Sequence, residues 1–340
     1  MPTGARMRGA NECATADLDN AFASAAARRP DLVSRMDRCI GGRSVAATVV
    51  GADLAGHLRR ALPSAPVGAP ALRISVWDVS ETDVPPPLLS GWETDGIRPG
   101  SDGDVFSHSR DRRHIRHEGP NFLLWLDRRE RHIIGWVRST ALLRPWLLNR
   151  PFQLLLAPWL SDIGVRLLHA AMVAPGERAV LLPGPSGAGK STTAVVCLRA
   201  GHHYLGDEAA AVEAGAGAVT GHCVNTPAKL NDGDGVGAGE TFLYPGDTSP
   251  EQVRLSAPIA AIAFPRVAGT AASRFTRMPA RRALPALMAC LISAEAGRVG
   301  SDFEFLSGLV ERLPCFELEL GRDAAGTAAA VAELSRQARP

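Results

Sequence analysis

The sequence GPSGAGKS at residues 184–191 decides the fold. It matches the phosphate-binding pattern G-x-x-x-x-G-K-[ST] at every fixed position. An apolar run at residues 179–182 precedes it, and a helical stretch at residues 191–200 follows it and stops at Gly201. The pattern therefore stands between a strand and a helix, which is the context that a phosphate loop requires.

The residue types in this loop suit a nucleoside triphosphate. Glycines let backbone N–H groups curl around phosphate oxygens, and the helix N-terminus adds a partial positive charge. Lys190 is placed to reach the β- and γ-phosphates, and the Ser191 hydroxyl is placed to ligate Mg²⁺. We expect ATP to contact nine consecutive residues: Gly184, Pro185, Ser186, Gly187, Ala188, Gly189, Lys190, Ser191 and Thr192.

Lysine is rare in this chain. Lys190 and Lys229 are the only lysines among 37 lysine and arginine residues. Such a bias favours roles for these two that a planar guanidinium cannot fill. For Lys229, which follows Pro227, two interpretations stay open: contact with the γ-phosphate or an acidic substrate, and chance.

Two carboxylates, Asp207 and Glu208, follow a short strand-like run at residues 202–206. The helix after the loop climbs about 15 Å, and about five extended residues return a similar distance. Asp207 is therefore expected back at the phosphate edge of the sheet. One carboxylate can hold Mg²⁺ while the other accepts a proton from an incoming hydroxyl. The alternative is a pair of solvated acids at a strand end.

His169 lies upstream of the loop, in a region that reads as a hairpin around Pro175 and Gly176. A tight turn there would set His169 opposite Leu182, two residues before the loop. In that position it would contact the phosphates or modulate the base. A histidine packed on the sheet is the alternative, and the sequence leaves both open.

His169, the phosphate loop and a carboxylate pair 17 positions after Lys190 together resemble the bacterial HPr kinase/phosphorylase family. The resemblance implies an α/β fold, with a P-loop kinase core of the HPr kinase and phosphoenolpyruvate-carboxykinase-like type. It also implies a serine kinase that uses ATP and Mg²⁺. Carried over by position, Asp207 would be the catalytic base and Glu208 would assist Mg²⁺ or the base. Ser191 would complete the metal site, and Lys190 and His169 the catalytic set.

The resemblance covers roughly residues 164–320. The downstream order is similar to that of relatives found beside peptide-modifying gene clusters: a Pro-x-Lys-Leu stretch, a strand at residues 259–264, and a final helix–strand–helix at residues 305–336. Residues 231–235 read NDGDG, where HPr-directed enzymes carry Glu-x-Arg-Gly. This departure argues against HPr as the substrate and against phosphorylase activity.

The rest of the chain is expected to form a mixed α/β accessory region. We divide the sequence into a loose or peripheral segment (1–43), the accessory region (44–150) and the catalytic domain (151–340). The expected elements are a weak helix at 17–38, strands at 45–50 and 72–77 with a helix at 54–62 between them, a long surface loop at 80–103, a three-stranded meander at 114–137, and a mainly helical stretch at 142–160.

Composition limits the classes of partner. The net charge of the 340 residues is +2, so no bulk field favours nucleic acid or a membrane surface, and we expect neither. The six cysteines include no CxxC pair, which favours a reduced cytoplasm. The segment from Arg254 to Arg282 contains six arginines and no acidic residue. Either these arginines are solvated or they clamp an anion. The sequence leaves homo-oligomerisation open.

These observations predict an ATP-dependent serine kinase. Its expected substrate is a serine hydroxyl of a peptide or small protein, with the precursor peptide of a modified natural product as one candidate. Two alternatives remain: a small-molecule or free-serine kinase on the same core, and a nucleotide-binding switch or assembly factor without turnover.

Overall fold

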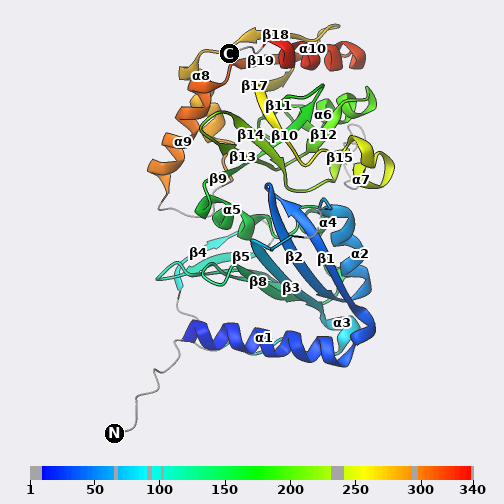
Figure 1. Ribbon diagram of the computed structural model, residues 1–340, viewed down its shortest axis with the longest axis vertical. Coiled ribbons are helices and arrows are strands. Elements are labelled where there is room, and N and C mark those ends of the chain that lie inside the picture. Colours follow the sequence, from blue (N-terminus) through cyan, green and yellow to red (C-terminus); the bar gives the residue numbers. More distant parts are fainter. Residues whose placement is uncertain are drawn as a thin grey trace. The chain divides into compact units, whose positions relative to one another are not determined.

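The computed structural model describes residues 10–64, 68–89, 94–100, 103–230, 241–292 and 298–337. The chain divides into two compact units (Figure 1). Unit 1 contains Met1–Arg38, Arg43–Arg59 and Ala65–Leu148, and unit 2 contains Cys39–Gly42, Arg60–Ser64 and Asn149–Pro340. Both units combine helices with a sheet, so the fold is α/β as expected. The NDGDG segment at residues 231–235 lies outside the described residues.

Unit 1 is built on an eight-stranded sheet with the order β1-β2-β3-β8-β7-β6-β5-β4. Its strands are β1 (Val33–Ile40), β2 (Arg43–Val50), β3 (Leu72–Asp78), β4 (Thr94–Pro99), β5 (Val105–Ser109), β6 (His114–Gly119), β7 (Phe122–Asp127) and β8 (His132–Val137). β2, β3 and β8 run parallel to one another, and β4 to β8 form an antiparallel meander. The expected strands at 45–50 and 72–77 and the meander at 114–137 are therefore confirmed.

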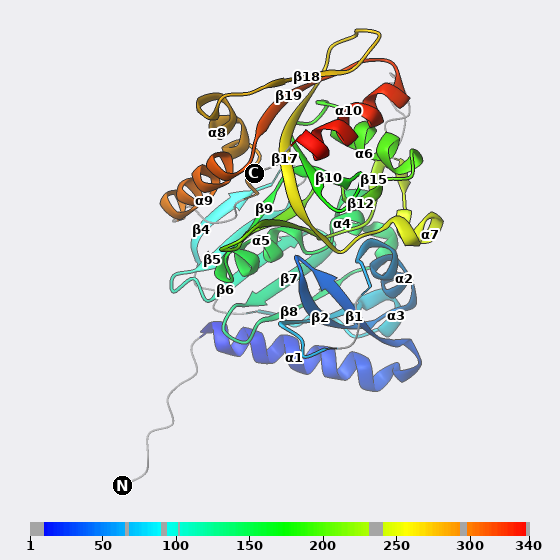
Figure 2. The ribbon, with the colours of Figure 1, turned by 45° about the horizontal axis from the view of Figure 1, so that its top comes forward.

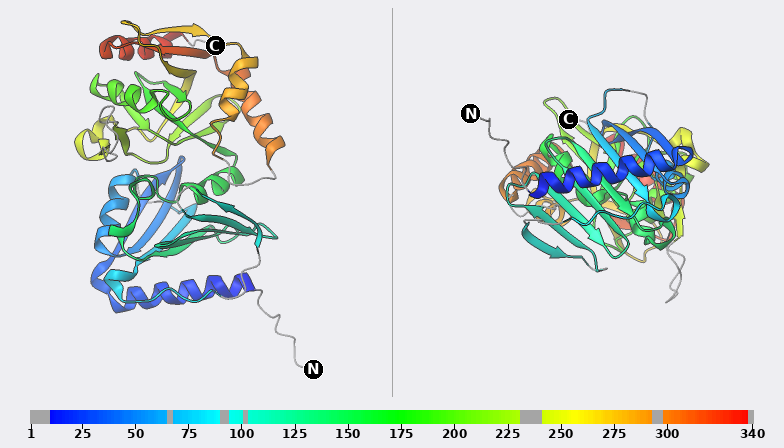
Figure 3. Two further views of the ribbon diagram at one scale, coloured as in Figure 1. Left: turned by 180° about the vertical axis from the view of Figure 1, so that it is seen from behind. Right: turned by 90° about the horizontal axis from the view of Figure 1, so that it is seen from below.

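Helices complete unit 1. They are α1 (Ala10–Arg28), η1 (Pro30–Leu32), α2 (Ala52–Ala61), α3 (Val79–Thr82), η2 (Thr140–Leu142) and α4 (Pro145–Asn149), with the last residues of α2 and α4 counted in unit 2. α2 connects the parallel strands β2 and β3, which need such a crossover. α1 lies across the sheet (Figure 3), where its fully buried Leu18 packs in one cluster with Trp77 and Trp125.

Two expectations for unit 1 were wrong. The helix expected at 17–38 ends at Arg28, because Pro30 cannot continue it, and Val33–Ile40 forms an edge strand. Within residues 1–43, residues 10–28 therefore form a helix packed on the sheet, and residues 33–40 form one of its strands. The surface loop expected at 80–103 also contains structure, namely the end of α3 and the strand β4.

Unit 2 is built on a nine-stranded sheet in which β12-β10-β11-β17-β14-β13-β9 are neighbours in that order, while β19 pairs with β17 and β18. Its strands are β9 (Val165–Leu168), β10 (Ala170–Ala174), β11 (Ala179–Pro183), β12 (His203–Gly206), β13 (Ala210–Ala214), β14 (Val219–Cys223), β17 (Ser256–Val267), β18 (Arg274–Arg277) and β19 (Cys315–Leu320), and a separate pair is formed by β15 (Ala228–Leu230) and β16 (Thr241–Leu243). Figure 2 shows the long strand β17 running through the middle of the unit.

The helices of unit 2 are α5 (Gln153–Asp162), α6 (Lys190–Arg199), α7 (Pro245–Thr248), η3 (Pro250–Gln252), α8 (Ala280–Met288), α9 (Val299–Arg312) and α10 (Ala324–Gln337). Alternating side chains of β10 supply two separate cores, as expected for a strand buried on both faces. Ala171 and Val173 join the cluster with α6 and α10, whereas Ala170 and Met172 join the cluster with α8 and α9. β11, which the phosphate loop follows, alternates in the same way: Leu182 joins the cluster with α6 and α10, and Leu181 joins the cluster with α8 and α9. The loop therefore leaves a strand that is fixed on both sides.

The hairpin register before the phosphate loop differs from the expected one. Ala171, not His169, lies opposite Leu182. The connection uses four residues, 175–178, instead of the tight two-residue turn that we assumed at Pro175 and Gly176, so the register moves by two positions. His169 stands between β9 and β10 instead of inside one strand.

None of the six cysteines, all of which lie within the described residues, forms a disulfide. Within the described residues, no helix combines the length and the apolar character that crossing a membrane requires.

Candidate functional site

The phosphate loop joins the end of β11 to the start of α6, as the sequence predicted. Gly187 and Gly189 have φ values of 79° and 97°, a backbone region that L-residues with a side chain rarely adopt. A Cβ at Gly189 would also lie 2.3 Å from Cδ1 of Leu320. Pro185, Ser186, Gly187 and Thr192 are exposed, Ala188 and Ser191 are half-buried, and Gly184 and Lys190 are buried.

Lys190 is held at two points by its own surroundings. Its Nζ donates to the carbonyl oxygen of Pro185 at 2.9 Å and to Nε2 of His169 at 3.0 Å. Only 3% of the residue is exposed, and this burial lowers the pKa of the ammonium. The ammonium therefore already points into the loop that would receive the phosphates.

His169 connects the loop lysine to the acidic pair. Burial, and next the charge of Lys190, lower its pKa, so the ring is neutral at pH 7. Because Nε2 accepts from Lys190, the proton resides on Nδ1, which donates to the carbonyl oxygen of Glu208 at 3.0 Å. The main-chain N–H of His169 donates to the main-chain carbonyl oxygen of Cys290 at 2.6 Å. His169 is therefore beside the loop because its side chain contacts Lys190, and not because it lies opposite Leu182 in the hairpin, as we had expected.

Asp207 follows β12 and lies beside the phosphate loop. β12 and β11 both pair antiparallel with β10, so they run in the same direction and end at the same edge of the sheet. The Asp207 carboxylate accepts from the Ser191 hydroxyl, from the N–H of Glu208 at 2.9 Å and from the N–H of Lys229 at 3.2 Å. The residue is fully buried, and burial raises its pKa to about 6.

Glu208 sits at the centre of a three-residue γ-turn. The N–H of Ala209 donates to the carbonyl of Asp207 at 2.8 Å, and Glu208 has a φ of 67°. A γ-turn with positive φ is rare and strained, and such strain collects at functional sites. The turn lets two neighbouring carboxylates take different partners instead of projecting to opposite faces of a strand.

Arg150 is a member of the site that our sequence analysis missed. It precedes α5, and its Nη1 donates to Oε2 of Glu208 at 3.0 Å. Its positive charge also acts on Lys190 and His169, lowering the pKa of each. No local pattern marks Arg150, because the contact with Glu208 spans 58 positions.

Lys229 serves the site through its backbone. Its main-chain N–H binds Asp207, at the start of the short pair β15–β16. Its side chain is half-buried, so contact of the ammonium with a phosphate or an acidic substrate stays a prediction.

A cavity of about 670 Å³ opens beside the loop. It is lined by residues 183–188, by His169 and Cys290, and by the apolar side chains of Phe264, Val267 and Met278. Arg266 and Arg282 lie at this cavity together with Glu317, which they contact at 3.1 and 3.2 Å. The site therefore has room for more than a triphosphate.

Most of the basic stretch from Arg254 to Arg282 is paired with acids from distant parts of the sequence. Arg254 binds Glu177 at 2.8 Å, and Arg266 and Arg274 bind Glu319 at 2.6 and 3.3 Å. Arg277 stacks over the ring of Phe316 at 5.2 Å. The sequence could not show these partners because they come from distant segments: Glu177 from the connection between β10 and β11, and Phe316 and Glu319 from β19.

The residues present fit a magnesium ion held jointly with phosphates. The described residues include no group of three His, Cys, Asp or Glu side chains arranged to hold a metal ion unaided. Mg²⁺ in kinases is bound by one or two carboxylates together with substrate phosphates and water. The contact between Ser191 and the Asp207 carboxylate matches the hydroxyl and acid that hold Mg²⁺ in phosphate-loop enzymes.

No protein-family model matches the sequence, and no curated protein matches it. Among solved structures, the chain is similar to the HPr(Ser) kinase/phosphatase from Coxiella burnetii. The two share 13% sequence identity with a TM-score of 0.30, over 51% of this chain and 95% of that chain. A likeness of this size establishes neither a shared fold nor a shared activity.

Proposed function

We propose that unit 2 is an ATP-dependent kinase of the HPr-kinase-like type, which transfers the γ-phosphate to a serine hydroxyl of a peptide or small protein. One observation carries the proposal: the fully buried Asp207 carboxylate, with a pKa of about 6, is hydrogen-bonded to Ser191 of the phosphate loop. A base whose pKa is close to the working pH, next to a phosphate site, is what phosphoryl transfer to a hydroxyl requires.

The proposed reaction is a direct displacement at phosphorus. The serine oxygen attacks the γ-phosphorus, the bond to the β,γ-bridging oxygen breaks, and ADP leaves. The hydroxyl proton passes to the carboxylate of Asp207. Bound Mg²⁺, held by Ser191, Asp207 and Glu208, would neutralise phosphate charge.

Positive groups around the loop support the transfer electrostatically. Lys190 would exchange its contacts with Pro185 and His169 for the β- and γ-phosphates. Arg150 is half-buried beside Glu208 and adds a second cation on the same side. Removing one such preorganised donor typically costs about 3 kcal/mol in the transition state.

The cavity beside the loop supports a peptide as the phosphate acceptor. At about 670 Å³ it exceeds the space that a single serine fills, and it joins an apolar wall to charged residues. Such a lining suits side chains on both sides of a phosphorylated serine.

The test is incubation of the full chain with Mg²⁺ and ATP labelled on the γ-phosphate, together with serine-containing peptides, including those encoded beside the gene. The Lys190→Ala variant is the matched control. Label on a serine hydroxyl with wild type, and none with the variant, would support the proposal. Turnover with free serine or a sugar but not with peptides would favour the small-molecule kinase. Nucleotide binding without any turnover would favour the switch or assembly factor.

A further inference from the structure

Two hairpin turns of unit 1 are rich in arginine. One joins β5 to β6 at residues 110–113, and the other joins β7 to β8 at residues 128–131. The turns lie side by side, because the main-chain N–H of Arg128 donates to the carbonyl oxygen of Arg113 at 3.0 Å. Six of these eight residues are arginine and two are acidic, Asp111 and Glu130. We call this surface the arginine turns.

Two of the six arginines already have partners. Arg113 pairs with Asp127 at 2.8 Å and with Glu12 of α1 at 3.0 Å. Arg128 donates to the carbonyl oxygen of Arg112 at 3.0 Å. The other four are exposed or half-buried, and their side chains make no ion pair or hydrogen bond within the part of the chain that the structure describes: Arg110, Arg112, Arg129 and Arg131. These four guanidinium groups are therefore open to an anion from outside.

Aspartate side chains hold both turns in place. In the first turn, the Asp111 carboxylate accepts from the main-chain N–H of Arg113 at 3.1 Å. In the second, the Asp127 carboxylate accepts from the N–H groups of Arg129 at 2.9 Å and Glu130 at 3.1 Å. A partner would therefore meet backbones that are already ordered, which lowers the entropy lost on binding.

Two of the open arginines occupy strained backbone positions. Arg112 has a φ of 55°, and Arg131 has a φ of 49°. This is the left-handed region, which glycine adopts freely and a residue with a long side chain does not. Glycine would fit both turns with less strain, so folding does not call for arginine here. Strain of this kind collects at functional sites.

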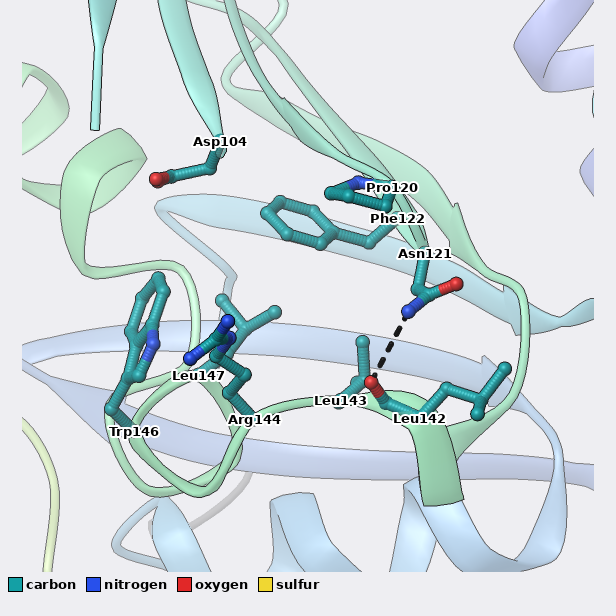
Figure 4. Close-up of a pocket in the computed structure, with 9 residues that line it drawn as sticks. All are labelled: Asp104, Pro120, Asn121, Phe122, Leu142, Leu143, Arg144, Trp146 and Leu147. Carbon is teal, nitrogen blue, oxygen red and sulfur yellow. Dashed lines mark hydrogen bonds between the residues drawn. The ribbon is translucent and has the colours of Figure 1, made fainter. Parts of the chain in front are cut away.

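The turn at the opposite end of these strands is covered instead of exposed. Between β6 and β7, Nδ2 of Asn121 donates to the carbonyl oxygen of Leu142 at 3.3 Å (Figure 4). Leu143 and Trp146, from the segment that follows β8, lie beside the same turn. By contrast, five of the eight residues in the arginine turns are exposed.

The residues around the arginine turns favour carboxylates over nucleic acid. Four rings lie between residues 110 and 131, and all are buried: His114, His117, Phe122 and Trp125. The bases of a single strand would therefore find no ring to stack on. A duplex carries one charge about every 1.7 Å, so it could not avoid the exposed carboxylates of Asp111 and Glu130. Acids spaced along a peptide can avoid them, and a guanidinium matches a carboxylate with two parallel hydrogen bonds.

We propose that the arginine turns are a docking surface for an acidic segment of a peptide or protein. Neighbouring hairpins lie about 10 Å apart, which is two strand spacings. Residues three positions apart in an extended peptide are separated by about the same distance. Two acids with this spacing would therefore reach one turn each. The surface belongs to unit 1 alone, so the inference is independent of the kinase proposed for unit 2.

The experiment is fluorescence anisotropy of a labelled peptide, with glutamate at every third position and glycine elsewhere, titrated with the full chain at low salt. This acidic peptide should bind. The same peptide with glutamine in place of glutamate should bind at least tenfold more weakly. Raising the NaCl concentration to about 0.5 M should also weaken binding, because salt screens exposed charges. A duplex oligonucleotide should bind more weakly than the acidic peptide.

Variants test which arginines the acidic peptide uses. The triple variant Arg110→Gln, Arg129→Gln and Arg131→Gln should weaken binding about tenfold. The matched control replaces the same number of exposed arginines in unit 2 and should leave binding unchanged: Arg199→Gln, Arg281→Gln and Arg322→Gln. The double variant Arg112→Gly and Arg131→Gly should weaken binding without lowering the urea midpoint of unfolding, because glycine relieves the backbone strain.

Four results would overturn the proposal. The first is no binding of the acidic peptide at low salt and submillimolar protein. The second is binding that the triple variant leaves intact while circular dichroism shows it folded. The third is a glycine double variant that is less stable than wild type and binds equally well, which would make the arginines structural. The fourth is a duplex that binds more tightly than the acidic peptide and loses affinity in the triple variant, which would make nucleic acid the partner.

Discussion

Replacing Asp207 by asparagine should change how the stability of unit 2 depends on pH. Burial raises the pKa of this carboxyl from 3.8 to about 6. That difference corresponds to about 3 kcal/mol between the protonated and the ionised folded protein. The residue is fully buried, so solvent screening does not reduce the figure appreciably.

Whether stability rises or falls with pH depends on whether the folded or the unfolded state binds the proton of Asp207 more tightly. A folded-state pKa above the unfolded value gives stabilisation that is complete below about pH 3.8 and is lost as the pH rises through about 6. At pH 7 the ionised carboxylate therefore destabilises the folded unit by about 3 kcal/mol compared with its protonated form. Asparagine cannot ionise, so the stability of the variant does not fall in this way as the pH rises.

The assay is urea unfolding of wild type and Asp207→Asn at pH 4.5 and pH 8, read by pulsed hydrogen exchange on peptides from β10 and β11. The quantity compared is the change in the free energy of unfolding between the two pH values. Hydrogen bonds that the substitution removes lower this free energy equally at both pH values and so cancel. About 1 kcal/mol of the total is already lost at pH 4.5, so the variant should gain about 2 kcal/mol on wild type between the two pH values. Asp247→Asn, which removes an exposed carboxylate of the same unit, is the control.

An equal difference at both pH values would refute a buried carboxyl with a raised pKa. The kinetic counterpart is single-turnover transfer, which should rise with pH up to about 6 in wild type and then level. Asp207→Asn should keep nucleotide affinity and lower transfer by about 10²- to 10⁴-fold. A transfer rate that is flat from pH 5 to pH 8 would remove Asp207 as the base.

Substitutions at four further residues test the rest of the site. Lys190→Ala should lower transfer about a hundredfold without unfolding the chain, as circular dichroism would verify, and Lys190→Arg should fail too because a guanidinium fork is too broad for the loop. Glu208→Gln should raise the Mg²⁺ concentration that half-maximal transfer requires; if added Mg²⁺ rescues Asp207→Asn but not Glu208→Gln, the two roles are reversed. Arg150→Gln should lower transfer at least tenfold with little change in nucleotide affinity, and an unchanged rate would make its contact with Glu208 merely structural. Gly189→Ala should weaken nucleotide binding at least tenfold in fluorescence titrations, since it combines a φ of 97° with a clash against Leu320; wild-type affinity would show that the loop adapts.

Much of the proposed nucleotide site could be predicted because its signals are local. Eight consecutive residues specify a strand end, a loop and a helix start, and β11 and α6 lie where the pattern placed them. The rise of α6 and the length of β12 are also fixed by backbone geometry, so the return of Asp207 to Ser191 could be estimated from residue counts alone.

The parts that could not be predicted depend on contacts between distant segments or on turn geometry. Arg150 reaches Glu208 only because the chain folds back over 58 positions. The positive φ of Glu208 has no residue signal, since glutamate is not a type that favours it. The position of His169 was expected for an incorrect reason, because a four-residue connection replaced the tight turn. Residues 33–40 were missed as a strand because their periodicity is weak and their pairing with β2 decides the outcome.

The pairings of β17 set the order in which the phosphate loop can become rigid. β11, which carries the loop, pairs with β10 a few residues away but also with β17, about 80 residues further along. Contacts of such long range form late and slow the folding of a chain. During synthesis, residues 184–191 therefore leave the ribosome well before the strand that completes their sheet, and in that interval only earlier elements such as the β10–β11 hairpin, α6 and β12 can support them. A nucleotide that binds the finished loop would find it assembled only after β17 has been made.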